Sequence, residues 1–229
     1  KLISRVMETL NLDPKRYPAR QFQSLISNAK NELQTPYQYL SAAQNQFETI
    51  VADVYTMYEK RLQQANALDF DDLIMKTVQV LQQFPETKAR FRSRFRHILV
   101  DEYQDTNATQ YEVLKLLVGG NHPDGARFTA VGDDDQSIYA WRGAKPENLN
   151  QLSEDFTGLK VIKLEQNYRS TQTILQAANG VIAFNFSRLG KELWTAGEQG
   201  EPITLYAGFN EHDEARFVVE QIEHWVADG

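Results

Sequence analysis

The feature that most constrains the fold is a series of three short β-rich runs, each of which ends in a cluster of polar residues. The runs are His97–Val100, Phe128–Val131 and Val161–Leu164. A helical pattern at Gln110–Val118 lies between the first two runs, and a helix predicted to begin near Thr171, capped by Ser170 or Thr171, follows the third. Strands that alternate with helices and are apolar almost throughout are typical of a buried parallel sheet. From about residue 95 onward we therefore expect an α/β fold.

The chain before this region has a helical pattern. Apolar residues recur at spacings of three and four from Phe47 to Leu62, and a second helix is predicted at Leu68–Val80, with Asp71 and Asp72 in its first turn. Near the other end of the chain, Ile203–Tyr206 is expected to add a strand. A helix from Glu211 to Val226 is expected to follow it.

The composition narrows the class of protein without fixing its function. The 229 residues contain no cysteine, which excludes disulfides and thiolate metal sites. The apolar runs are too short to span a bilayer, so no membrane partner is expected. The net charge of −7 argues against a wholly basic surface for nucleic acid, but it permits a local basic groove because salt screens charges beyond about 10 Å.

The first polar cluster places Asp101 and Glu102 directly after an apolar strand. Functional groups in α/β sheets gather beyond the carboxyl ends of the strands. Mg²⁺ prefers oxygen ligands, for which Asp101 is the candidate, acting through water. A neighbouring carboxylate such as Glu102 can take a proton from an attacking water. The alternative is a solvated acidic turn without catalytic function.

The second polar cluster extends from Gly132 to Gly143 and combines an amide, two aromatic rings and a cation. Gln136 is a neutral amide suited to sensing a γ-phosphate. Tyr139 and Trp141 are two residues apart, so an extended segment would put them on one face beside Arg142, which suits stacking on unpaired bases. The alternative is that both aromatic rings belong to the core.

The third polar cluster contains Tyr168 and Arg169. An arginine just beyond a strand can stabilise charge on a transferred phosphoryl group, and a tyrosine can stack on a nucleotide base. The alternative for Arg169 is a structural ion pair. A basic stretch with interleaved aromatics, Lys88–His97, is a further candidate for nucleic acid, but we interpret it as the exposed side of a helix that leads into the first strand.

Taken together and in this order, the three clusters resemble the Walker B, sensor and arginine motifs of UvrD/Rep/PcrA-type superfamily 1A DNA helicases. Other segments that look like the family are Leu68–Leu73, Asp105–Asn107 and Arg188–Lys191. The resemblance covers nearly the whole chain, and Leu189–Trp194 is closest to the UvrD type. It implies a partial RecA-like parallel-sheet motor core with an inserted all-helical subdomain. Residues 1–93 would be the helical subdomain (1B-like), 94–159 the later part of the first motor domain (1A-like), and 160–229 the start of the second (2A-like).

The resemblance also implies residue roles and ligands. Asp101 would hold Mg²⁺, Glu102 would activate water and Gln136 would sense the γ-phosphate of ATP. Tyr168 would stack on adenine, and Arg169 would act as an arginine finger. Tyr139, Trp141 and Arg142 would face single-stranded DNA. The family's activity is ATP-driven 3′-to-5′ translocation and unwinding at duplex junctions, in replication or repair, in the bacterial cytoplasm at the nucleoid.

One family element does not occur in these residues, namely the G-x-x-x-x-G-K-[ST] loop that cradles phosphates. We expect the chain to be a fragment that begins after this loop, and whether it is an expressed piece or a natural truncation stays open. Two rival functions also stay open. One is a non-catalytic DNA-binding or regulatory module, against which the presence of Glu102 and Arg169 argues. The other is the motor part of a helicase–nuclease subunit, whose nuclease residues would have to lie elsewhere.

The missing phosphate loop generates a first prediction. The 229-residue polypeptide by itself should not hydrolyse ATP at a helicase-like rate, because nothing in it would clamp and orient the triphosphate. A steady-state ATPase assay in the presence of single-stranded DNA measures this rate. Turnover near the scale of about 1–100 s⁻¹ that is typical of phosphoryl-transfer enzymes would contradict the prediction.

Overall fold

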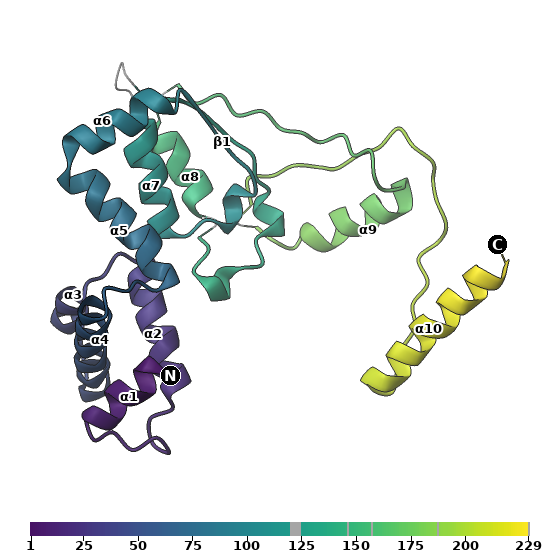
Figure 1. Cartoon of the computed structure of the whole chain (residues 1–229). Coiled ribbons are helices and arrows are strands. Elements are labelled where there is room, and N and C mark those ends of the chain that lie inside the picture. The colour runs from purple at the N-terminus through teal and green to yellow at the C-terminus, as the bar shows by residue number, and fades with distance from the viewer. Residues whose placement is uncertain (120–124, 146, 157, 187, 229) are drawn as a thin grey trace. The chain divides into compact units, whose positions relative to one another are not determined.

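The computed structural model describes residues 1–119, 125–145, 147–156, 158–186 and 188–228. The chain divides into two compact units, Lys1–Lys160 and Val161–Gly229, and each has its own internal packing (Figure 1).

The first unit begins with a helical segment whose described elements before residue 95 are all α-helices. They are α1 (Leu2–Thr9), α2 (Ala19–Asn31), α3 (Pro36–Ala42), α4 (Gln46–Gln64), α5 (Phe70–Gln83) and α6 (Pro85–Arg94). A buried core joins α1, α2 and α4 through Val6, Phe22 and Val54. The helices predicted near residues 47–62 and 68–80 are confirmed as α4 and α5. The basic stretch at Lys88–His97 is confirmed as mainly helix α6, which buries none of its side chains.

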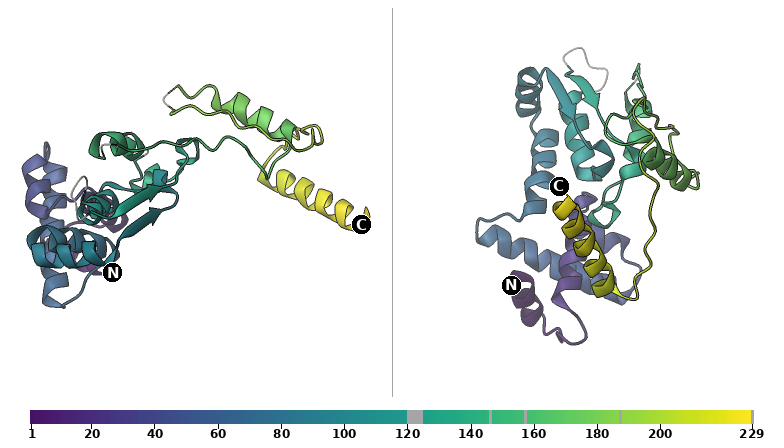
Figure 2. Two further views of the ribbon diagram at one scale, coloured as in Figure 1. Left: turned by 90° about the horizontal axis from the view of Figure 1, so that it is seen from above. Right: turned by 90° about the vertical axis from the view of Figure 1, so that its right-hand side faces the viewer.

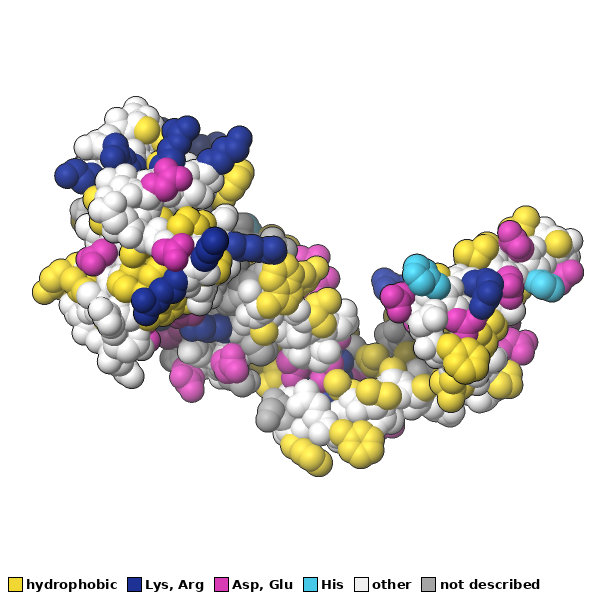
Figure 3. Space-filling model, turned by 90° about the horizontal axis from the view of Figure 1, so that it is seen from below, with side chains coloured by type: hydrophobic (Ala, Val, Ile, Leu, Met, Phe, Trp, Pro, Cys, Tyr) yellow, Lys and Arg dark blue, Asp and Glu magenta, His cyan; other side chains and the backbone are white. Residues whose placement is uncertain are grey.

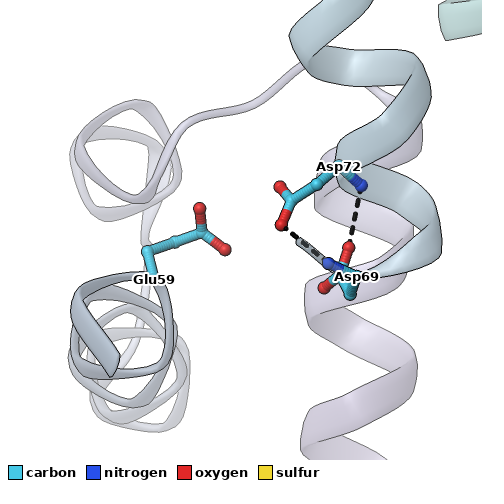
Figure 4. Close-up of side chains that lie close together, drawn as sticks. All are labelled: Glu59, Asp69 and Asp72. Atoms are coloured by element: carbon cyan, nitrogen blue, oxygen red, sulfur yellow. Dashed lines mark hydrogen bonds between the residues drawn. The ribbon is translucent and has the colours of Figure 1, made fainter. Parts of the chain in front are cut away.

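Lys30, near the end of α2, is buried completely and is surrounded by three carboxylates. Its Nζ lies 2.6 Å from Glu59 Oε1, 2.7 Å from Asp69 Oδ2 and 2.8 Å from Asp72 Oδ1. Glu59 extends from α4, whereas Asp69 and Asp72 form the reciprocal capping box that begins α5 (Figure 4). One ammonium group therefore joins three helices.

The electrostatics of this cluster favour the charged form of Lys30. Burial lowers the pKa of Lys30, but its contacts with Asp69, Asp72 and Glu59 outweigh burial and hold that pKa well above its ordinary value. For a raised lysine pKa, the stabilisation is fully present below the unfolded value of about 10.5 and is lost only as the pH rises through the folded value. The cluster therefore stabilises the fold throughout the neutral range.

A small parallel sheet follows the helical segment. Strand β1 (His97–Val100) pairs with β2 (Arg127–Ala130), with His97 opposite Arg127, and helix α7 (Ala108–Val118) lies between them in the chain. Helices α5 and α6 pack against α7, as two further views show (Figure 2). The prediction of a mixed fold with a parallel sheet is thereby confirmed. The predicted loop at Asn121–Gly125 falls mostly on residues 120–124, which lie outside the described residues.

A second apolar core lies beside the sheet. Tyr103, Tyr111 and Leu152 are buried there, with Phe128 and Phe156 packed against them. Tyr103 comes from the short 3₁₀ helix η1 (Tyr103–Asp105), and Leu152 comes from α8 (Glu147–Asp155). The aromatic rings of this core meet edge to face, because Tyr103 and Tyr111 have ring centroids 6.4 Å apart at an interplanar angle of 78°. This core anchors the turn that follows β1.

The second unit contains α9 (Gln172–Ile182) and α10 (Glu211–Asp228), which confirm the two helices predicted there. Thr171 is the N-cap of α9, but its side chain makes no capping bond, and the backbone N–H groups of Gln172 and Thr173 donate instead to the carbonyls of Glu198 and Gln199. Many large apolar side chains of this unit are exposed, including Leu205 and Phe209. Hydrophobic side chains also lie at the surface on the face drawn in Figure 3.

Two predicted strands are wrong. Among the described residues, Val161–Leu164 forms no strand, and backbone pairing nearby is limited to one parallel bridge between Gln166 and Trp194. Ile203–Tyr206 also forms no strand, and Tyr206 stacks on Phe217 of α10 with ring centroids 3.8 Å apart. An apolar run with strand propensity becomes a strand only where a neighbouring backbone pairs with it.

The Lys30 cluster generates a stability prediction. Lys30→Met should lower the free energy of unfolding by about 3–5 kcal/mol, because it leaves three carboxylates without their counter-ion. The matched control is Lys145→Met, which breaks an exposed ion pair with Glu32 of 2.8 Å and should cost about 0–1 kcal/mol. Urea denaturation of both variants makes the comparison. Equal losses of stability would contradict the structural importance of the cluster.

Candidate functional site

The two loops that carry the predicted site residues leave the sheet at the same edge. The backbone pairing continues past the strand ends, since Val131 N–H donates to Val100 O at 2.8 Å and Tyr103 N–H donates to Val131 O at 2.9 Å. The loop after β1 thereby lies against the loop after β2. Both follow the carboxyl ends of parallel strands, where ligand sites of α/β folds occur.

Asp101 and Glu102 form the exposed part of the first loop. Glu102 has a left-handed backbone with φ of 48°, which is uncommon for a residue other than glycine, and its N–H donates to Asp101 Oδ1 at 2.9 Å. The next two residues, Tyr103 and Gln104, are buried. The turn therefore exposes the two carboxylates while the ring of Tyr103 fixes it to the core.

Gln136 lies on the second loop, in the 3₁₀ helix η2 (Asp134–Gln136). Asp133 caps this helix, because its Oδ1 accepts from Asp135 N–H at 3.0 Å and its Oδ2 accepts from Gln136 Nε2 at 2.6 Å. The N–H of Asp133 itself donates to Gln104 Oε1 at 2.9 Å. The structure thus brings the loops of Glu102 and Gln136 together.

Gln104 is a residue to which the sequence assigned no role. Its side-chain Nε2 donates to Glu102 Oε2 at 2.8 Å, and its Oε1 accepts from the second loop. The only signal in the sequence is its position two residues after Glu102. The sequence alone does not indicate whether a polar residue next to an apolar strand is buried.

Tyr139 and Trp141 lie together further along the second loop. Their ring centroids are 6.3 Å apart at an interplanar angle of 51°. The expected extended segment is wrong, because Ala140–Arg142 forms the 3₁₀ helix η3, which ends at Gly143 with φ of 82°. Trp141 is 76% exposed and does not belong to the core of this structure. The side chain of Arg142 lies outside the described part of the structure.

Tyr168 and Arg169 lie in the second unit and are both exposed. Asn167 shapes their turn, because its Oδ1 accepts from Arg169 N–H at 2.9 Å and from Ser170 N–H at 2.7 Å. Tyr168 OH donates to Gln166 Oε1 at 2.7 Å. The two predicted residues therefore occupy adjacent positions on an Asn-stabilised turn rather than the end of a regular strand.

Among the residues that the structure describes, two groups of carboxylates have oxygens within 4.8 Å of one another, a spacing that could hold a metal ion. In the group of Glu59, Asp69 and Asp72, the ammonium of Lys30 already supplies the cation. In the group of Asp133, Asp134 and Asp135, both oxygens of Asp133 accept hydrogen bonds from its own loop. Asp101 differs from both groups, since it presents an exposed carboxylate at a strand end.

Comparison with known proteins assigns the chain to a family. The fold and the site define an α/β protein with acidic loops at the carboxyl edge of a parallel sheet. A family described as the UvrD/REP helicase N-terminal domain matches residues 1–157, and one described as the UvrD-like helicase C-terminal domain matches residues 162–229. The chain belongs to the UvrD/Rep helicase family.

Several curated proteins are similar to this chain. The ATP-dependent DNA helicase UvrD1 of Mycobacterium tuberculosis is 51% identical over 229 residues, which cover 97% of this chain and 30% of that protein. DNA helicase II of Escherichia coli is 44% identical, covering 100% of this chain and 31% of that protein. The ATP-dependent DNA helicase PcrA of Leuconostoc citreum is 45% identical, covering 97% and 29%. The chain therefore spans about 30% of the length of these relatives.

None of the described helices is both long enough and apolar enough to cross a membrane.

Proposed function

We propose that this chain is part of the motor of an ATP-dependent DNA helicase, which couples ATP hydrolysis to the unwinding of duplex DNA. One observation carries the proposal. The carboxyl edge of the parallel sheet brings the loop of Asp101 and Glu102 against the loop of Gln136 in a member of a helicase family. The curated relatives that are named ATP-dependent DNA helicases support the same assignment.

We extend the proposal to the domains of the motor. Residues 1–93 form the inserted helical subdomain, 94–159 the later part of the first RecA-like domain, and 160–229 the start of the second. Support comes from the helical segment α1–α6, from the parallel pair β1–β2 and from the two family matches, which meet between residues 157 and 162.

Each predicted site residue then has a chemical role. Asp101 fits a Mg²⁺ site, because its exposed carboxylate follows a strand and this hard cation prefers oxygen ligands. When bound, Mg²⁺ neutralises charge on the phosphate oxygens. Glu102 accepts a proton from the attacking water, and the amide of Gln136 donates a hydrogen bond to the terminal phosphate.

The proposal also gives roles to two residues of the second unit. The exposed guanidinium of Arg169 stabilises charge on the transferred phosphoryl group, and the exposed ring of Tyr168 stacks on adenine. The turn that Asn167 stabilises carries Tyr168 and Arg169 at consecutive positions.

The aromatic pair of Tyr139 and Trp141 is the proposed contact with single-stranded DNA. Exposed aromatic rings stack on bases of any sequence, and Arg142 adds a cation at the next position. We propose 3′-to-5′ translocation towards duplex junctions, with repair or replication proteins as further partners. The site of action is the nucleoid in the cytoplasm of bacteria, the organisms of the curated relatives.

The role of Glu102 is tested by Glu102→Gln in the full-length parent helicase. ATP binding should stay nearly unchanged, while hydrolysis should fall by at least about 100-fold, because the amide cannot accept the proton of water. The control is Glu154→Gln, at an exposed position on α8 outside both acidic loops. Nucleotide titration and steady-state turnover measure the two effects. Near-normal turnover of Glu102→Gln would move the water-activating role to another residue.

The role of Trp141 is tested by Trp141→Ala in the same parent protein. Because the indole is exposed, stability should change little, whereas affinity for single-stranded DNA should fall by about 1–3 kcal/mol. ATP hydrolysis should also become uncoupled from strand separation. The matched control is Tyr37→Ala, another aromatic ring that is 78% exposed. A loss of about 3–5 kcal/mol in stability with intact DNA affinity would show instead that the indole is a core residue in the parent.

A further inference from the structure

Gln104 is a buried polar side chain situated between the two acidic loops. It is only 1% exposed, although Glu102 and Gln136 on either side of it are exposed. Its amide makes a hydrogen bond at each end, as a donor to Glu102 Oε2 at 2.8 Å and as an acceptor from Asp133 N–H at 2.9 Å. A buried amide with both ends engaged in this way fixes the two groups that it contacts.

The hydrogen bonds continue from Gln104 to Gln136. Asp133, whose N–H binds Gln104, accepts from Gln136 Nε2 through its Oδ2 at 2.6 Å. One unbroken path therefore runs from the carboxylate of Glu102, through Gln104 and Asp133, to the amide of Gln136. The two ends of the path are the side chains proposed to activate water and to sense the terminal phosphate.

The amide of Gln104 packs closely against the backbone of Gly132. A Cβ atom added at Gly132 would lie 3.0 Å from Gln104 Oε1 and 3.2 Å from Tyr103 Cβ. Gly132 thus provides the space in which the Gln104 amide reaches the second loop. The backbone hydrogen bond from Tyr103 N–H to Val131 O also holds the segment of Gln104 against the segment of Gly132.

We propose that Gln104 is a positioning residue that aligns Glu102 with Gln136, and this inference rests on the proposed function. The residue type fits the task, because an amide can donate to a carboxylate and accept from a backbone N–H at the same time. A glutamate at this position could only accept, and an apolar residue could do neither. Gln104 bonds to Oε2 of Glu102, so Oε1 is the carboxylate oxygen that this bond does not engage.

Two variants of the parent helicase separate the two bonds of Gln104. Gln104→Glu keeps an acceptor for Asp133 N–H but removes the donor to Glu102, whereas Gln104→Met removes both. The matched control is Asn148→Leu. Asn148 is an amide of 2% exposure that donates to Thr106 O at 2.9 Å and lies outside the path from Glu102 to Gln136.

Both Gln104 variants should lower kcat for ATP by about 10- to 100-fold, the range found when the partner that orients a reactive group is removed, with little change in KM. Amide hydrogen exchange gives a readout independent of activity. Exchange of the Asp133 N–H should accelerate in Gln104→Met and stay slow in Gln104→Glu, because only the methionine variant lacks the acceptor. Asn148→Leu should lower the thermal midpoint while leaving kcat and the exchange of Asp133 nearly unchanged.

Combination with Glu102→Gln distinguishes failure of this inference from failure of the proposed function. If Gln104 acts through Glu102, adding Gln104→Met to Glu102→Gln should lower the residual single-turnover rate no further. A further full loss in the double variant, or a kcat loss as large in Asn148→Leu, would overturn the positioning role. Normal turnover of Glu102→Gln alone would reject the proposed base. The exchange of Asp133 would still report whether Gln104 holds the second loop, and unchanged exchange in Gln104→Met would refute that link.

Discussion

The arrangement of the site depends on the backbone of Val131, one residue beyond β2. Its N–H and C=O bind Val100 and Tyr103 on either side of the acidic pair, so the parallel pairing extends past the ends of the strands. Because Asp101 and Glu102 lie between these two anchor points, they must bulge out of the sheet into solvent. The left-handed backbone of Glu102 is the conformational cost of this bulge, and the buried ring of Tyr103 offsets it by packing in the core.

Within the same unit, hydrogen bonds connect the segment after the acidic pair to the end of α2. Thr109 Oγ1 donates to the carbonyls of Lys30 and Asn31 at 3.1 and 2.6 Å, and Asn107 Nδ2 donates to Asn31 Oδ1 at 3.0 Å. Asn107 is also the N-cap of α7, the helix that follows the acidic loop. The side chain of Lys30 fixes this end of α2 to α4 and α5, while its backbone fixes it to α7. The end of α2 is therefore bonded to α4, α5 and α7 together.

The loop that carries the aromatic pair is attached to the same place. Lys145 N–H donates to Thr106 O at 3.0 Å, and the Lys145 ammonium pairs with Glu32, the residue after α2, at 2.8 Å. In the proposed motor, the end of α2 contacts both the segment after the acidic pair and the segment after Trp141. These contacts give a physical route between the proposed ATP and DNA sites within one compact unit.

The sequence predicted those elements whose pattern is local. The periodicity of Phe47–Leu62 reflects one buried helix face, and the apolar run His97–Val100 has a pairing partner in β2. The runs at 161–164 and 203–206 have the same propensity, but a strand also needs a neighbour, which no local pattern reveals.

The site was predictable to a similar degree. The exposed residues, including Glu102 and Trp141, could be selected because their types match a chemistry and their order matches a family. Lys30 and Gln104 could not be selected from the sequence, because each contacts residues that are distant in the sequence, such as Asp69 and Asp133. The spacing of the two aromatic residues does not predict the turn at Ala140–Arg142, because that turn ends at Gly143 with a left-handed backbone.

A structure of the full-length parent helicase bound to Mg²⁺, a non-hydrolysable ATP analogue and single-stranded DNA is the most direct measurement of the central claim, that the carboxyl edge of β1 and β2 is a catalytic ATP site. We expect the terminal phosphate to lie beside both Glu102 and Gln136, with the amide of Gln104 still bonded to Glu102. A terminal phosphate bound away from this edge, with Glu102 facing only solvent, would contradict the claim.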